Sequence, residues 1–160
     1  MVEQQPKPAS SKKKHVEPGP ERPEDESQAA VSYFSFQELR PLTEEELKNP
    51  DGFCESVLQQ SKSEDWKEQY EAVNQLRVIN KHNRAYLQTK MSNFAEFVKS
   101  QTDNLRSNLI KNSLLFVKEL FTERSDKELS EFVRIVLPHV LLKTVYEKNF
   151  IVVEAKACME

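Results

Sequence analysis

Residues 63–76, with the sequence SEDWKEQYEAVNQL, decide the fold that we expect for this chain. Asp65, followed three residues later by Glu68, can form a reciprocal capping box, a pattern typical of a helix start. Beyond it, large apolar residues recur at helical spacing and polar residues fill the positions between them, which predicts one buried face. That face consists of Trp66, Tyr70, Val73, Leu76 and Ile79. We therefore expect an amphipathic helix that ends near residues 80–83.

The only tryptophan of the chain, Trp66, stands in the first turn of this helix and beside a loop. Two roles fit that position. Tryptophan is usually buried for its large apolar area, so Trp66 could fasten two helices together. Alternatively, the ring is presented to a partner. The sequence alone leaves both roles open.

The composition favours an all-α protein. The chain has two glycines, 31% charged residues and little of the alternating β-branched pattern of strands. The formal net charge of −3 argues against general nucleic-acid binding, which favours a basic excess. Cys54 and Cys158 are too few and too far apart for a disulfide framework or a zinc site, so we expect reduced thiols in a cytosolic compartment. No apolar run approaches membrane-spanning length, and we expect no membrane partner.

The chain divides into three parts by composition. Residues 1–30 consist mainly of Pro, Lys, Glu, Ser and Gln, and we expect a disordered tail because they carry almost nothing to bury. Residues 31–52 should hold a docking segment and a short helix. Residues 53–160 carry the remaining amphipathic helices.

Within residues 31–52, three aromatic residues, Tyr33, Phe34 and Phe36, indicate a segment that docks onto the folded part. Thr43 and the glutamates after it offer a capping box for the short helix. Asp51-Gly52 is a turn signal, which places the start of the next helix at about residue 53.

The later helices are expected in consecutive pairs, with Leu105, Leu141, Val153 and Ala157 among the inward residues. A further capping box is expected at residues 125–128, and Pro138 should kink its helix. The expected ranges are 53–61 with 66–80, 87–101 with 105–121, and 129–144 with a helix from 150 onward. Capping residues Asp65, Asn104 and Asn149 begin the second helices at intervals of 39 and 45 residues, close to the roughly 40–47 of HEAT-type repeats. Such pairs stack into an α-solenoid, and a compact helix bundle is the alternative.

Four stretches carry a family resemblance: SEDWK (63–67), NLRS (104–107), LFVKELF (115–121) and KNFIVVEA (148–155). Together they resemble the TOG domains of the CLASP family and of the crescerins, the TOG array regulators of axonemal microtubules. The similarity covers about residues 39–160. It implies a HEAT-repeat paddle that binds tubulin or microtubules along one edge, through the turn inside each helix pair. It also implies a cytoplasmic, cytoskeletal setting that includes the cilium and axoneme.

The resemblance implies one tubulin-contacting group in each turn, and these groups together would form a basic ridge suited to an acidic surface. The candidate residues are Trp66 and Lys67 in the first turn, Asn104 and Arg106 in the second, and Lys148 and Asn149 in the third.

The chain also departs from the family pattern. A full TOG domain has six HEAT repeats, and residues 53–160 hold three at most, the third incomplete. A solenoid without a polar capping repeat exposes its stacking face, so we expect Ile151, Val152, Val153 and Met159 to be uncovered. The alternative function is therefore a helical scaffold that binds another protein, or a second copy, through its C-terminal face.

Catalysis is not expected. His15, His82 and His139 do not stand at metal-ligand spacing, so neither a metal nor a cofactor is expected. The sequence holds no Gly-rich phosphate loop and no nucleophile elbow. The expected function is binding.

Overall fold

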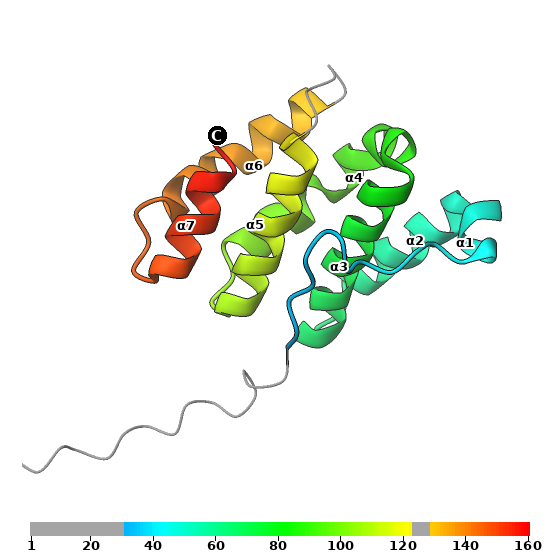
Figure 1. Cartoon of the computed structure of the whole chain (residues 1–160), viewed down its shortest axis with the longest axis horizontal. Helices are drawn as coiled ribbons and strands as arrows, with labels where there is room; N and C mark the ends of the chain where they lie inside the picture. The colour runs from blue at the N-terminus through cyan, green and yellow to red at the C-terminus, as the bar shows by residue number, and fades with distance from the viewer. Residues whose placement is uncertain (1–30, 123–128) are drawn as a thin grey trace, which may run out of the picture. The chain divides into compact units, whose positions relative to one another are not determined.

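The computed structural model describes residues 31–122 and 129–160, and all of their regular structure is helical (Figure 1). This confirms the all-α class for the described residues. The predicted tail at residues 1–30 and the capping box at 125–128 lie outside them. The helices are α1 (Glu44–Lys48), α2 (Pro50–Ser61), α3 (Trp66–His82), α4 (Arg84–Thr102), α5 (Ser107–Thr122), α6 (Ser130–Lys143) and α7 (Asn149–Ala157).

The six longer helices pack as consecutive pairs, α2 with α3, α4 with α5 and α6 with α7. Each helix also packs on its equivalent in the next pair, so that α4 contacts both α2 and α6, and α5 contacts both α3 and α7. Two rows of helices result, one of α2, α4 and α6 and one of α3, α5 and α7 (Figure 1). The second helix of every pair therefore begins at the same edge.

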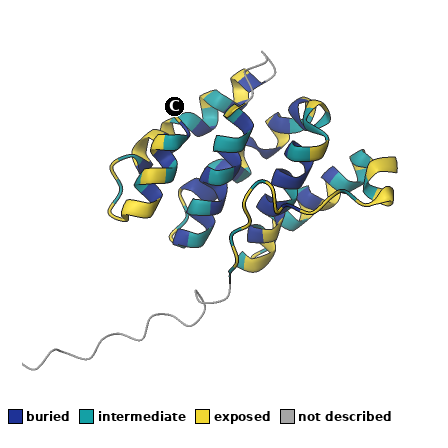
Figure 2. Ribbon diagram, viewed as in Figure 1, coloured by how far each residue is buried: buried dark blue, intermediate teal, exposed yellow. Residues whose placement is uncertain are grey.

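Apolar side chains from α2 to α7 form one continuous core. Figure 2 shows the buried residues concentrated in α3, α4 and α5, whereas α1 has none. Phe116 of α5 and Phe132 of α6 meet edge to face in this core, with ring centroids 6.5 Å apart. The core thus joins all three pairs.

A buried polar network fixes α3 against α5. The Arg77 guanidinium is fully buried and donates to Glu119 through Nη2 at 2.6 Å and Nε at 2.9 Å. Asn112 Nδ2 donates to the carbonyl of Tyr70 at 3.2 Å and to Asn74 Oδ1 at 3.1 Å. Because these groups need each other to replace lost hydration, they hold the two helices in one register.

Residues 31–42, which we call the strap, lie along α3 and α5. Tyr33 Oη donates to Asn108 Oδ1 at 2.7 Å, and Lys81 Nζ donates to the carbonyl of Gln37 at 2.9 Å. Leu39 is the buried apolar residue of the strap. These contacts are of the kind expected for the aromatic docking segment.

The capping signals in the sequence predict some helix ends correctly and others incorrectly. Thr43 and Glu46 form the predicted capping box of α1. The turn predicted at Asp51-Gly52 is wrong, because α2 already begins at Pro50. Asn49 caps this helix by accepting from the Gly52 N–H at 3.0 Å, and proline is well suited to a first helical position. A side chain at 52 would meet Asn49 Nδ2 at 2.3 Å, so the capping side chain would have to shift to accommodate it.

The expected reciprocal box at α3 forms only in part. Asp65 Oδ1 accepts from the Lys67 N–H at 2.9 Å. The Asp65 N–H, however, donates to Ser63 Oγ at 3.1 Å, so Ser63 occupies the position predicted for Glu68. The helix still begins and ends where the sequence predicts.

Of the residues predicted to face the core, three are exposed and one is only half-buried. Leu105 is 96% exposed because α5 begins only at Ser107. Leu141 and Val153 are exposed, and Ala157 is half-buried.

Conversely, Ile151 is fully buried, although we expected it to be uncovered. The inward face of α7 is formed by Ile151, Ala155 and the adjoining Cys158, whose thiol contacts the Leu114 carbonyl of α5 at 3.3 Å. The apolar run in this helix is continuous, so the sequence did not specify which side faces α5.

Candidate protein-binding edge

The turns before α3, α5 and α7 lie along one edge of the described helices, at the bottom of the view in Figure 1. We call this the turn edge, and it comprises residues 62–67, 103–107 and 144–150. The arrangement follows from the pairing, because each of these turns connects the two helices of one pair. Two contacts join neighbouring turns and give the edge its geometry.

The first contact joins the first and second turns. The Arg106 guanidinium carbon lies 5.1 Å from the centroid of the Trp66 ring, and Lys67 Nζ lies 5.9 Å from the same centroid. Trp66 and Arg106 are both half-buried, whereas Lys67 is exposed. A cation over the face of an indole ring is attracted by the ring quadrupole. Trp66 therefore lies close to two cations and keeps part of its surface open to solvent.

The second contact joins the second and third turns. Lys148 Nζ donates to Ser107 Oγ at 2.5 Å, and Ser107 is the first residue of α5. Lys148 and Asn149 are both exposed. The structure therefore brings Trp66, Arg106 and Lys148 into one continuous row.

Asn104 has a structural role inside the second turn. Its Oδ1 accepts from the Arg106 N–H at 2.9 Å, which is an Asx-type hydrogen bond to the backbone two residues on. This bond shapes the turn that lifts Leu105 into solvent. Asn104 therefore uses its side-chain oxygen to position its neighbours, and this oxygen is already hydrogen-bonded within the turn.

Sequence reasoning missed two apolar side chains at this edge. Leu105 is 96% exposed in the second turn, and Val145 is 84% exposed in the third. A leucine one residue from a helix start looks like a core residue, so only the true start of α5 at Ser107 reveals its exposure. With Trp66, each of the three turns presents at least one apolar side chain close in sequence to a basic one, and the third turn also exposes Phe150.

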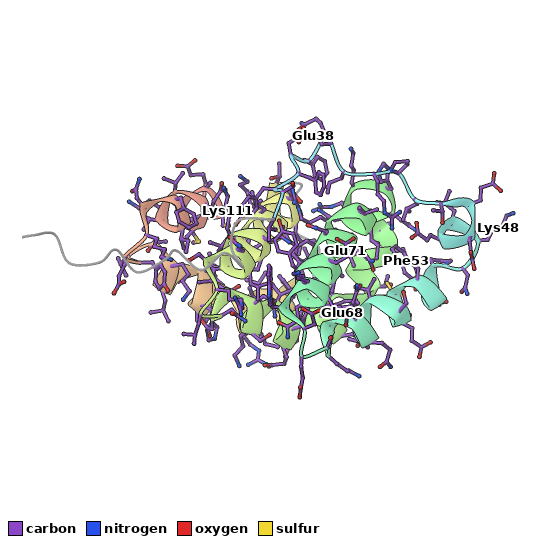
Figure 3. The ribbon with its side chains drawn as sticks, turned by 90° about the horizontal axis from the view of Figure 1, so that it is seen from below. Glu38, Lys48, Phe53, Glu68, Glu71 and Lys111 are labelled. Atoms are coloured by element: carbon purple, nitrogen blue, oxygen red, sulfur yellow. The ribbon has the colours of Figure 1, made fainter. Side chains whose placement is uncertain are left out.

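Lys111 of α5 is a further basic residue near the edge, labelled in Figure 3. Its Nζ lies 4.3 Å from the Tyr33 ring centroid and 5.8 Å from that of Phe150. Tyr33 belongs to the strap and Phe150 to α7, so no local sequence pattern could have predicted this cluster.

Acidic residues interrupt the basic ones along the turn edge. Asp65 is used in capping α3. Asp103 lies 2.5 Å from His139 Nδ1 and 4.0 Å from Lys143 Nζ, both on α6. Glu64 and Glu147 are exposed and carry no such internal role in the contacts described. The edge is therefore of mixed charge, with its cations gathered around Trp66 and Ser107.

The two thiols are packed groups and lie outside this edge. Burial raises the pKa of Cys158 to about 12 and also raises the pKa of Cys54. Both are buried and unbridged. Thiols of raised pKa are poor nucleophiles at neutral pH, so neither adds reactive chemistry.

Comparison with protein-family models, with curated proteins and with solved structures finds no match for this chain. Among residues 31–122 and 129–160, no group of three or more His, Cys, Asp or Glu side chains is arranged to hold a metal ion. Of the helices described, none combines the length and apolarity needed to cross a membrane.

Proposed function

We propose that residues 53–160 form a TOG-like array of three HEAT-type helix pairs that binds tubulin through the turn edge. The observation that supports this proposal is a repeated pattern along the turn edge. Trp66, Leu105 and Val145 each lie in the turn of one helix pair, with a basic residue close by in the sequence. The sequence resemblance to TOG domains supports tubulin as the partner and a cytoskeletal setting that includes the cilium. The function is one of binding, without catalysis.

The packing of the pairs supports a solenoid over a closed bundle. Every helix contacts its partner and the equivalent helix of the adjacent pair, which is the contact pattern of a stacked repeat. In such an array each turn projects from the same edge. The edge then acts as an extended binding surface with regularly spaced anchors.

The energetics of protein interfaces favour apolar side chains at the centre of the contact and charged side chains around them. A few central aromatic or aliphatic side chains supply most of the free energy of a typical interface, while charges steer the encounter and set specificity. Trp66, Leu105 and Val145 can supply the buried area. Lys67, Arg106 and Lys148 can supply attraction to an acidic partner.

The decisive test is Leu105→Ser in the full chain, assayed by cosedimentation with microtubules and by size-exclusion binding to free tubulin. Leu105 is almost fully exposed, so the free energy of unfolding should change by less than about 0.5 kcal/mol. Binding should weaken by about tenfold, as expected for loss of an interface anchor. Leu47→Ser is the matched control, because Leu47 is an exposed leucine on α1, outside the turn edge. Equal binding by both variants and the unmodified chain would overturn the proposal.

Trp66→Ala tests the two roles that the sequence left open for the tryptophan. If Trp66 anchors the partner, binding should fall by about 2 kcal/mol, roughly thirty-fold, while the melting temperature changes little. If it only fastens helices, the melting temperature should fall by several degrees and binding per folded molecule should stay the same. Arg106→Glu should weaken binding more at low salt than at high salt, because exposed charges are screened.

A second candidate function is a helical scaffold that binds another protein through the third pair. Leu141, Leu142 and Val153 are exposed on α6 and α7. Exposed apolar residues in such numbers are typical of a contact surface. This scaffold function predicts that Leu105→Ser and Trp66→Ala leave partner binding unchanged, whereas Leu142→Glu abolishes it.

A further inference from the structure

The strap, the C-terminal halves of α3 and α5, and Arg84 of α4 line an open cavity of about 530 Å³. Its lining starts at Arg77 on α3 and at Leu115 on α5, whereas the turn edge lies at the N-terminal ends of these helices. The cavity is therefore a separate site. Its volume falls within the roughly 300–1,000 Å³ of small-molecule binding pockets.

Four cationic side chains and one carboxylate line this cavity. The cations are Arg77, Lys81, Arg84 and Lys118, and the carboxylate is Glu119. Glu119 is already held by two hydrogen bonds from Arg77. Lys118 pairs with Glu154 of α7 at 2.9 Å, whereas Lys81 hydrogen-bonds to the backbone carbonyls of Gln37 and Leu39.

The two lysines keep donor capacity beyond their internal bonds. Lys81 Nζ donates to the carbonyls of Gln37 at 2.9 Å and Leu39 at 3.4 Å, and Lys118 Nζ donates to one oxygen of Glu154. An ammonium group has three donors. Both are half-buried, so they can reach an anion that enters from solvent.

Aromatic rings form the wall that the strap contributes. Phe34 is 44% exposed and Phe36 is half-buried, and both line the cavity. The Phe34 carbonyl accepts from Arg77 Nη2 at 2.7 Å, so the backbone is fixed while the ring remains available. Glu38 lies at the outer side of the strap, away from the helices, and is not part of the lining (Figure 3).

A buried amide donor in the lining lacks a partner. Asn80 Oδ1 accepts from Arg84 Nη1 at 3.1 Å, which fixes the orientation of the amide. Its Nδ2 has no hydrogen-bond partner, although the residue is almost completely buried. An unpaired buried donor is costly, so an acceptor atom of a ligand that reached it from this cavity would stabilise it.

We propose that this cavity binds a small organic anion that carries an aromatic ring, of the nucleoside phosphate class. Lys81 and Lys118 bind its anionic group through charge-assisted hydrogen bonds. The ring packs against Phe34 and Phe36. Asn80 donates to an acceptor atom of the ligand. This site is independent of the turn edge and of its partner.

The test is calorimetric titration of the full chain with ATP, with inorganic triphosphate and with adenosine. ATP combines the anion and the ring, whereas each of the other two probes carries one of them. ATP should bind at least about tenfold more tightly than either, because stacking and charged hydrogen bonds both contribute. ATP in large excess should also raise the melting temperature.

Two variants and one control test whether ATP binds in this cavity. Lys118→Met should weaken ATP by about tenfold through loss of a charged hydrogen bond. Phe34→Ala should weaken ATP but not triphosphate, and should leave the fold intact because the ring is partly exposed. Lys90→Met is the matched control, since Lys90 is a partly buried lysine of α4 that pairs with Asp51 at 3.1 Å outside the cavity.

The outcomes separate clearly. Affinity lost in both cavity variants and kept in Lys90→Met and Trp66→Ala supports the site. Three results would each overturn it: no heat with ATP at millimolar concentration, triphosphate binding as tightly as ATP, or equal loss of affinity in Lys90→Met.

Discussion

At the scale of single residues, Arg77 has the largest structural role in the described part of the chain. Its charge is fully buried and is neutralised by Glu119, 42 positions later in the sequence. The apolar stripe of α3 gave no sign of it, because Arg77 directly follows Leu76 and reads as a solvated charge. Only the partner helix determines whether such a residue is buried, and a single helical pattern does not contain that information.

Arg77→Ala should lower the free energy of unfolding by about 3 kcal/mol or more, because it leaves Glu119 buried without a counter-charge. Urea denaturation monitored by circular dichroism measures this change. Arg134→Ala is the control, since Arg134 pairs with Glu131 at 2.5 Å on the exposed face of α6. That surface pair should contribute less than about 1 kcal/mol. Similar losses in the two variants would contradict a structural role for the buried pair.

At the scale of elements, capping chemistry predicted helix starts unevenly. The Thr43 box was predicted correctly because both of its partners are local. The start of α2 was missed because Asn49, Pro50, Asp51 and Gly52 are all turn-forming residues that also make a good helix N-terminus. Leu105 was misplaced for a related reason: an Asx turn at Asn104 delays the start of α5 to Ser107.

The α1 cap should make stability depend on pH in the acidic range. The hydrogen bond from Arg40, together with bonds from Thr43, lowers the pKa of Glu46 to about 2 from its ordinary 4.5. A carboxyl whose pKa is lower in the folded state stabilises the fold above pH 4.5. That contribution is lost as the pH falls from 4.5 towards 2. Its size should be under about 1 kcal/mol, because the pair lies at the surface and Arg40 is exposed to solvent.

Glu46→Gln removes this titration while keeping a side chain that can accept hydrogen bonds. The unmodified chain should therefore lose more stability than the variant between pH 6 and pH 2.5, as measured by urea denaturation at both values. Glu44→Gln serves as the control, because Glu44 pairs only with the solvated Lys48 at 3.6 Å. An equal pH dependence in the unmodified chain and Glu46→Gln would show that the cap does not contribute.

At the scale of the whole described region, the sequence predicted the helix pairs well. It predicted less well which side of each helix is buried. The helical spacing of apolar residues indicates that a stretch is a helix, and capping residues indicate where the helix begins. The six long helices could therefore be predicted from the sequence. The cavity could not, because it is formed by the strap together with residues of α3 and α5 that are distant in sequence. The turn edge was anticipated only at residues that the family resemblance highlighted, and Leu105 and Val145 needed the structure.

The third pair carries the last prediction. Leu142 and Val153 are 63% and 56% exposed on α6 and α7, and Leu141 is exposed beside Leu142. Water contact with these side chains is unfavourable, so a second copy can remove them from solvent at low energetic cost. We expect concentration-dependent self-association in sedimentation velocity experiments at tens of micromolar protein, a range set by the modest apolar area. Leu142→Glu should shift the chain to a monomer, because a charge at the contact must be desolvated. Leu47→Glu, on α1, should not. A monodisperse monomer for the unmodified chain would show that these side chains tolerate solvent, and would contradict this prediction.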